Sequence, residues 1–202
     1  MLAFLGWNPG TEQELFSFAD LIESFDLKRV GKSGAKFNIE KAHWFNQQYM
    51  QNKDARELAK TFLPILKQKG IAKSLDFVEK VVSSIKERAV FVNDFWDLSS
   101  FFFEAPSSYD TKASKKNWKE GTPLLMEELI TIIASLDHFS SENTEKKVKE
   151  WIVSKDIGFG KVMQPLRLSL VGALKGPHLF DITELIGKEE TVKRIQNAIK
   201  NL

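Results

Sequence analysis

The sequence contains no cysteine and only three histidines among its 202 residues. Without cysteine, the chain can form neither a disulfide framework nor a thiolate metal site, and this composition suits a reducing compartment such as the cytosol. His43, His138 and His178 stand far apart, and none belongs to a metal-ligand spacing such as HExxH. The sequence therefore predicts no metal site.

Long apolar runs are missing as well. No run approaches the roughly 20 residues that a helix needs to cross a bilayer. The opening residues, MLAFLGWNPG, lack the basic region and the small-residue cleavage site of a signal peptide. We therefore expect a cytoplasmic protein with no membrane partner.

An excess of one charge is also absent, since the formal net charge is only +2. Proteins that bind nucleic acid through a diffuse basic coat are usually more positive. If this chain binds RNA, a local face and a few residues must do so. The hydrophobic fraction of 43% is ordinary for a globular protein, and the length permits one large domain or two small ones.

No catalytic constellation is visible, and no nucleophile–base pair stands out. Residues 30–33, Val-Gly-Lys-Ser, resemble the end of a phosphate-binding P-loop. The full signature needs a glycine five residues before Gly31, where Asp26 would instead repel phosphate. The sequence favours a basic loop here and predicts no catalytic residue anywhere in the chain.

Cap residues followed by helical periodicity predict an all-α fold of roughly ten helices, with no convincing strand. Four side chains have the position of N-caps: Ser17, Asn38, Asp54 and Ser74. Thr122 and Asn143 are interpreted as further helix starts. The main helices are expected at 18–25, 39–50, 55–67, 75–88, 93–103, 124–136, 144–155 and 188–201.

Several connecting segments carry their own signals. Residues 1–7 resemble the end of a helix. Residues 105–110 predict a linker, and the lysine-rich run 112–116 a solvated helix start or a linker. The stretch 160–187 predicts two short helices, with Pro165 in the first turn of one of them. Residues 93–103 are aromatic on nearly all sides, which favours the centre of a helical bundle.

Two basic places could bind RNA. One is the loop with Lys28, Arg29, Lys32 and Lys36, which leads into a helix with Lys41, Asn46, Gln47 and Tyr49. Such a loop can follow a phosphate backbone, while amide side chains bond to sugars or bases; the alternative is a loop that only aids solubility.

The other basic place is Arg88, which stands beside aromatic residues. An arginine can contact a base edge with two hydrogen bonds, and aromatic rings can stack an unpaired base. The alternative is a surface ion pair of Arg88 with Glu87 or Glu104.

The opening fifty residues resemble the region after the catalytic domain of bacterial glutamyl-tRNA synthetases. The similarity rests on an LGW turn at 5–7, on Arg29-Val30, and on a motif that stands here as Phe37-Asn38, Lys41-Ala42, Trp44, Asn46 and Tyr49. Asn38 and Ala42 replace the family's usual Asp and Leu. Asparagine caps a helix as well as aspartate does, so the first departure is mild.

A second similarity to the same family lies in 160–189. It is carried by Gly160, Pro165, Leu166, Arg167, Leu170, Gly172, Pro177, Leu179, Phe180, Asp181, Ile182, Leu185, Gly187, Lys188 and Glu189. Ser169 and Val171 stand where Ala and Thr are common. The resemblance thus extends over essentially the whole chain.

The resemblance implies the non-catalytic C-terminal portion of a ligase that joins glutamate to tRNA(Glu) with ATP and magnesium, with the catalytic domain absent from this chain. It implies a monomer with no cofactor in this portion. It implies a stem-contact segment at 1–50 and two all-α anticodon-binding subdomains at 51–106 and 107–202.

Site residues follow from the resemblance too. The family carries an arginine that reads the third anticodon base, and its place corresponds to Arg88, with Lys86 as the alternative register. An arginine there suggests an enzyme that accepts only tRNA(Glu). Arg167 is implied to lie near the anticodon. The tRNA stem would be met by Arg29, Lys36, Lys41, Asn46 and Tyr49. Two other functions stay open from the residues alone, a helical protein-interaction module and a stand-alone enzyme.

Overall fold

The computed structural model describes residues 1–31, 34 and 36–202, and its regular structure over these residues is helical. One isolated antiparallel bridge, between Trp7 and Val30, is the exception in the described ranges. The all-α prediction is therefore confirmed. The α-helices are α1 Phe18–Ser24, α2 Ile39–Asn52, α3 Ala55–Gln68, α4 Leu75–Ile85, α5 Asp94–Phe103, α6 Thr111–Asn117, α7 Thr122–Ala134, α8 Ser141–Ser154, α9 Gly160–Val171, α10 Leu179–Ile186 and α11 Lys188–Asn201.

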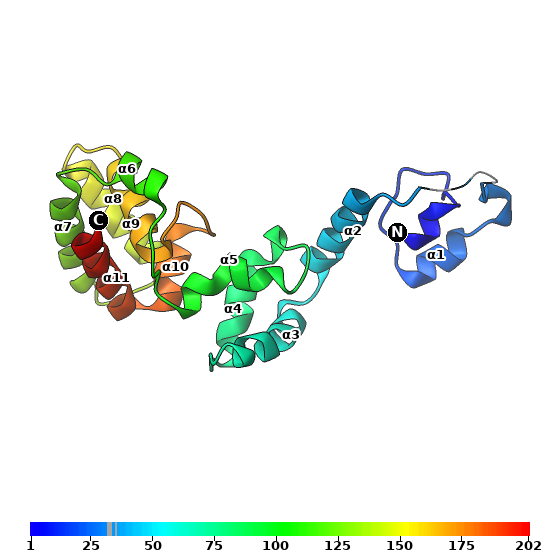
Figure 1. The fold of residues 1–202 in the computed structure, drawn as a ribbon, viewed down its shortest axis with the longest axis horizontal. Coiled ribbons are helices and arrows are strands. Elements are labelled where there is room, and N and C mark those ends of the chain that lie inside the picture. Colours follow the sequence, from blue (N-terminus) through cyan, green and yellow to red (C-terminus); the bar gives the residue numbers. More distant parts are fainter. Residues whose placement is uncertain (32–33, 35) are drawn as a thin grey trace.

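The helices are strung out along one direction (Figure 1). The N-terminus and α1 lie at one end, and α2 leads from them to a middle group, α3 to α5. The helices α6 to α11 form a bundle at the other end. Three short 3₁₀ turns, η1 Leu2–Leu5, η2 Leu27–Arg29 and η3 Lys86–Arg88, complete the described secondary structure. Over these same residues, no helix combines the length and the apolar character needed to cross a membrane.

The four predicted N-caps are confirmed. Asn38, Asp54 and Ser74 each accept a hydrogen bond from the backbone amide three residues on. Ser17 does the same with Asp20, whose carboxylate accepts from the Ser17 amide in return. Each cap satisfies an amide that has no partner within its helix, so the starts of α1 to α4 are readable from local sequence.

Two later helix starts were predicted wrongly. The helix α8 begins at Ser141, because Ser140 accepts from the Asn143 amide and is the true cap. The Asn143 side chain instead donates to the His138 carbonyl, at 2.6 Å. Thr122 is the first residue of α7, and its hydroxyl accepts from the Lys119 amide in the preceding turn rather than capping α7.

Two further expectations need correction, and for a third the structure selects the helix start over the linker. Pro165 lies inside α9 rather than in its first turn, since the helix starts at Gly160 with bonds from the amides of 162 and 163 to Phe159. Residues 2–5 form one 3₁₀ turn, not the end of an α-helix. The run 112–116 lies within a helix of its own, α6, capped by Asp110.

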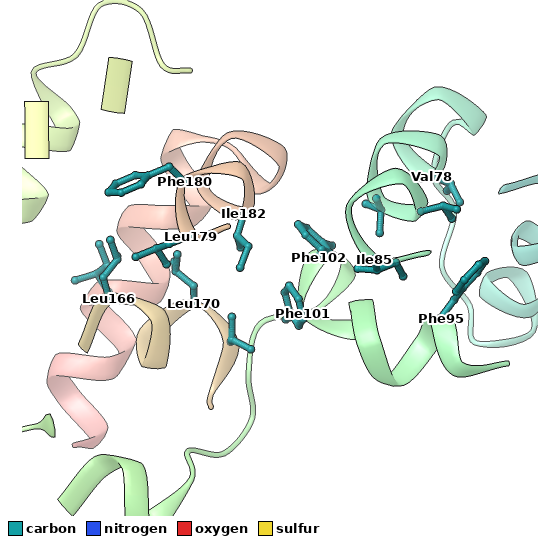
Figure 2. Close-up of a cluster of buried hydrophobic side chains, with 14 of the residues drawn as sticks. Val78, Ile85, Phe95, Phe101, Phe102, Leu166, Leu170, Leu179, Phe180 and Ile182 are labelled. Atoms are coloured by element: carbon teal, nitrogen blue, oxygen red, sulfur yellow. The ribbon is translucent and has the colours of Figure 1, made fainter. Parts of the chain in front are cut away.

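The hydrophobic core runs without a break from the middle group into the bundle, and α5 is shared by both. At its start, Phe95 packs edge-on against Phe62 of α3, with ring centroids 5.5 Å apart. At its end, Phe101 and Phe102 are buried and lie between the two groups (Figure 2). Figure 2 shows Val78, Ile85 and Phe95 on one side of them, and Leu166, Leu170, Leu179, Phe180 and Ile182 on the other. The aromatic helix was expected at the centre of a bundle, and it lies instead between the middle group and the bundle.

A buried arginine fastens α5 to the bundle. Arg194 of α11 is only 2% exposed. Its guanidinium donates to the carbonyls of Phe101, at 2.6 Å, and Leu170, at 2.9 Å. Its Nε donates to Glu190, at 2.8 Å. One charged group therefore satisfies backbone acceptors at the ends of both α5 and α9.

The segment 105–110 is tied to the end of α9. The Asp110 amide donates to the Gly172 carbonyl, at 2.7 Å. Gly172 terminates α9 in the left-handed region, with φ of 79°. A Cβ added there would lie 2.5 Å from the Ser108 carbonyl oxygen. Only glycine fits this conformation and this contact together.

Candidate nucleic-acid interface

Arg88 lies on a short loop that joins α4 to α5. The helix α4 ends at Ile85, and η3 carries the chain through Arg88 to the buried Ala89. The side chain of Arg88 is exposed. It forms no hydrogen bond or ion pair with any other described residue, so the pairing with Glu87 or Glu104 considered above is not observed in this part of the chain.

The loop is shaped by the first residue of α5. The carboxylate of Asp94 accepts from the backbone amides of Val90, at 2.9 Å, and Phe91, at 2.8 Å. These bonds curl the chain back on itself between η3 and α5. This turn leaves the side chain of Arg88 exposed, whereas the side chain of Ala89 is buried in the core.

Arg167 lies close to Arg88 although the two are far apart in sequence. Its guanidinium donates to the carbonyls of Lys175, at 3.1 Å, and Pro177, at 2.9 Å, in the loop between α9 and α10. Burial lowers the pKa of Arg167 from its ordinary value, and the positive charge of Arg88 lowers it further. The fold therefore brings together the two arginines that the sequence marked separately.

The two guanidinium groups are thus near enough to repel each other. Each guanidinium has several N–H donors in a rigid plane, which suits bidentate contacts to a base edge or a phosphate. An electron-rich partner placed between them would relieve the repulsion. The described surroundings of Arg88 supply no such partner, so the pair can take one from another molecule.

Lys86, the alternative to Arg88, has a different environment. Its ammonium group donates to the Lys53 carbonyl at the end of α2, at 2.9 Å. That carbonyl has no partner within its own helix, so the lysine acts as a cap from outside. Arg88 is accordingly the freer of the two side chains.

The predicted stem-contact residues fall into two groups. Arg29, Asn46 and Tyr49 are engaged within the chain: they donate to the carbonyls of Pro9, Val90 and Phe16, the last at 3.1 Å. The other two are at the surface. Lys36 is exposed, and Lys41 forms an exposed ion pair with Glu14.

Part of the basic loop lies outside the described residues. Lys32, which the sequence grouped with Lys28, Arg29 and Lys36, is one of the residues not described, and so is Ser33 of the P-loop-like run.

Two glutamines were missed as possible site residues. Gln47 was named beside the basic loop as an amide that could bond RNA but not as a residue that acts on Arg88, and Gln51 was not noted at all. Both donate to the carbonyl of Glu87, the residue before Arg88, at 3.0 and 3.1 Å. Their spacing of four residues places them on one face of α2, a signal that was available but that pointed to no particular acceptor.

One cleft in the described structure has a lining that does not suit ATP. This cleft of about 590 Å³ lies between α4 and α10, and Asp76, Glu79, Asp181 and Glu184 line it together with Lys80. Four carboxylates would repel a triphosphate. No cluster of three or more potential metal ligands occurs in the described ranges.

Comparisons with known proteins agree with this geometry. The family model of the anticodon binding domain matches residues 54–199. The glutamate–tRNA ligase of Flavobacterium johnsoniae is 61% identical over 201 residues, which are 100% of this chain and 40% of the relative. That of Flavobacterium psychrophilum is 57% identical over the same share of both. The chain thus spans about two fifths of the length of these relatives.

Solved structures agree with the sequences. A crystal structure of a glutamate–tRNA ligase from Elizabethkingia meningosepticum, in complex with its amino acid, has a TM-score of 0.95 and 46% identity. The match covers 100% of this chain and 40% of that one. A synthetase from Elizabethkingia anophelis has a TM-score of 0.91 and 45% identity, over 98% of this chain and 39% of that one.

Proposed function

Because this chain belongs to the anticodon-binding domain family and matches glutamate–tRNA ligases along its whole length, we propose that it is the C-terminal, tRNA-reading part of such a ligase. The ligase joins glutamate to tRNA(Glu) with ATP. We assign ATP and magnesium to the part of the relatives that this chain does not match, since the acidic cleft between α4 and α10 would repel a triphosphate. The intact protein acts as a cytoplasmic monomer.

The division of labour follows the chain. Residues 1–50 meet the tRNA stem, and residues 51–106 and 107–202 form two anticodon-binding subdomains. The convergence of Arg88 and Arg167 supports this proposal most strongly. Arg88 comes from the first subdomain and Arg167 from the second, and the charge of one lowers the pKa of the other. A loop of unpaired bases between them would be contacted from both sides.

Arg88 reads the third anticodon base in this proposal, and Arg167 contacts the neighbouring part of the loop. Arg167 is held by two carbonyls, so its charge is kept in place before RNA arrives. The free side chain of Arg88 can form a bidentate contact with a base edge. The stem is met by the exposed Lys36 and Lys41. Arg29 and Tyr49 act chiefly by holding the stem-contact segment together, and Asn46 ties that segment to the loop between α4 and α5.

Replacing Arg88 with alanine is expected to remove discrimination at the third anticodon base, at a cost of about 1–3 kcal/mol. The measurement is fluorescence anisotropy of the chain with a tRNA(Glu) anticodon stem-loop and with a stem-loop altered at the third base. The ratio of the two Kd values should fall in Arg88→Ala. The matched control is Arg56→Ala, which removes an exposed arginine that pairs with Asp76 and Glu79 in α4.

Several outcomes would contradict the proposal. One is an unchanged Kd ratio in Arg88→Ala. Another is binding of both RNAs no tighter than that of a scrambled RNA at low salt. Specific binding should weaken as salt rises, because phosphate contacts release counterions. Saturable binding of a protein with no effect of RNA would instead support a protein-interaction module.

A further inference from the structure

The carbonyl of Glu87 is left without a helical partner by the way the loop turns. In a continuing helix, it would accept from the amides of Val90 or Phe91, three and four residues on. Both amides donate instead to the carboxylate of Asp94. The Glu87 carbonyl therefore needs a hydrogen-bond donor from outside its own helix, as helix-end carbonyls do.

The helix α2 supplies that partner twice. The side-chain amides of Gln47 and Gln51 donate to the same oxygen, at 3.0 and 3.1 Å. A carbonyl oxygen has two lone pairs, so both are used. Both glutamines are half-buried, although the two bonds themselves lie at the surface.

The position of this carbonyl matters because it belongs to the peptide unit that ends at the nitrogen of Arg88. A peptide unit is planar, so fixing the carbonyl direction fixes the N–H direction of Arg88 as well. Rotation of the peptide unit between Glu87 and Arg88 would break both bonds to the glutamines. The two donors therefore hold the peptide unit before Arg88, and the bond from the Ala89 amide to the Lys86 carbonyl holds the one after it, so that both together restrict the direction of the Arg88 side chain.

Neighbouring contacts hold the same loop at other points. Asn46 donates to the Val90 carbonyl, and Lys86 reaches back to the Lys53 carbonyl at the end of α2. Ala89 is fully buried. In the described chain, the side chain of Arg88 is thus an exposed group on a backbone that is held on both sides.

From these contacts we infer that Gln47 and Gln51 are positioning residues for anticodon reading, which act through Arg88 and not by touching RNA. The inference rests on the proposed function. It makes the specificity of the anticodon contact depend on α2, a helix of the stem-contact side. It also identifies a shared carbonyl oxygen as one physical link between the two regions.

The test uses Gln47→Met and Gln51→Met, alone and together, in the full chain. Methionine keeps the length of the side chain but has no donor. In the double variant, the ratio of Kd values for the altered and the cognate anticodon stem-loop should fall about 3- to 10-fold, as for the loss of one oriented hydrogen bond. Each single variant retains one donor to the same oxygen, so its ratio should change less than half as much on a logarithmic scale.

A control variant and a test in the Arg88→Ala background distinguish a positioning role from a general loss of structure. Gln48→Met alters a half-buried neighbour on α2 with no side-chain hydrogen bond in the described structure, and its ratio should stay unchanged. In an Arg88→Ala background, the double substitution should change the ratio less than about 2-fold, because the side chain that it positions is gone. Thermal unfolding of each variant reports any loss of fold separately.

The outcomes separate this inference from the proposed function. If the double variant weakens both RNAs equally, or acts as strongly without Arg88 as with it, the positioning role is overturned while the reading by Arg88 stands. If Arg88→Ala itself leaves the ratio unchanged, the proposed function fails, and the inference that rests on it fails too. A fall in the ratio that requires Arg88 supports both.

Discussion

Replacing Arg194 with methionine is expected to lower the free energy of unfolding by about 3–5 kcal/mol. Methionine fills much of the same volume but donates no hydrogen bond. The carbonyls of Phe101 and Leu170 would then be buried without their donor, and each unsatisfied group costs about 1–3 kcal/mol. Urea unfolding followed by circular dichroism measures the change.

The control for this prediction is Arg56→Met, which removes an exposed arginine that forms ion pairs at the surface. Exposed pairs contribute little, so its unfolding curve should nearly match that of the unaltered chain. If Arg194→Met unfolded at the same urea concentration as Arg56→Met, the bonds to Phe101 and Leu170 would not be holding the helices together.

Replacing Gly172 with alanine is expected to cost about 2–5 kcal/mol. The left-handed conformation at φ of 79° costs an alanine about 1–2 kcal/mol. The added Cβ would also meet the Ser108 carbonyl oxygen at 2.5 Å and the Pro106 Cβ at 2.9 Å, and overpacking costs about 1–3 kcal/mol more. The segment 105–110 would have to move off the end of α9, which thermal unfolding detects.

Gly70 provides the matched control, because it has φ of 76° but no atom within 4 Å of the position of an added Cβ. Gly70→Ala should therefore cost only the conformational part, about 1–2 kcal/mol. The difference between the two variants isolates the contact with Ser108 and Pro106. Equal losses in both would mean that the segment 105–110 yields at no cost.

The parts of the fold that were predictable are those that local chemistry determines. Ser17, Asn38, Asp54 and Ser74 each cap a helix by a bond to an amide three residues away, so a short window of sequence contains the whole interaction. The same local rule gave the wrong cap at Asn143. Two serines precede it, and Ser140 is the residue that caps α8. Local sequence rules identify residues that can cap a helix, but they do not decide which of several neighbouring candidates does so.

The interior of α9 shows a second limit. Pro165 was expected in a first turn, where its missing amide bond does no harm. The helix begins a turn earlier, because its first bonds close onto Phe159 and Gly158 and Pro165 is then buried within the bundle. Burial of the surrounding apolar residues outweighs the free-energy cost of a proline inside the helix. The hydrophobic periodicity near the glycine-rich start of the helix does not show which of these two effects is larger.

The candidate site was predictable in its members but not in its assembly. The resemblance marked Arg88 and Arg167 one by one, yet only the tertiary packing of α4 against α10, and of α10 against α9, brings their charges near each other. The role of Gln47 and Gln51 was beyond local rules, because the acceptor is a backbone atom some forty residues away. A hydrogen bond from a side chain to a distant backbone atom produces no periodic pattern in the sequence.

The shared position of α5 has a consequence for how the molecule comes apart. Phe95 belongs to the packing of α3 and α4, whereas Phe101 and Phe102 at the other end of the same helix also contact the bundle. If either group unfolded, apolar side chains of α5 would lose their packing partners, and the other group depends on that helix. The two subdomains on either side of the boundary proposed at residue 106 should therefore unfold as one cooperative unit. Residues 51–202 should lose their structure in a single transition.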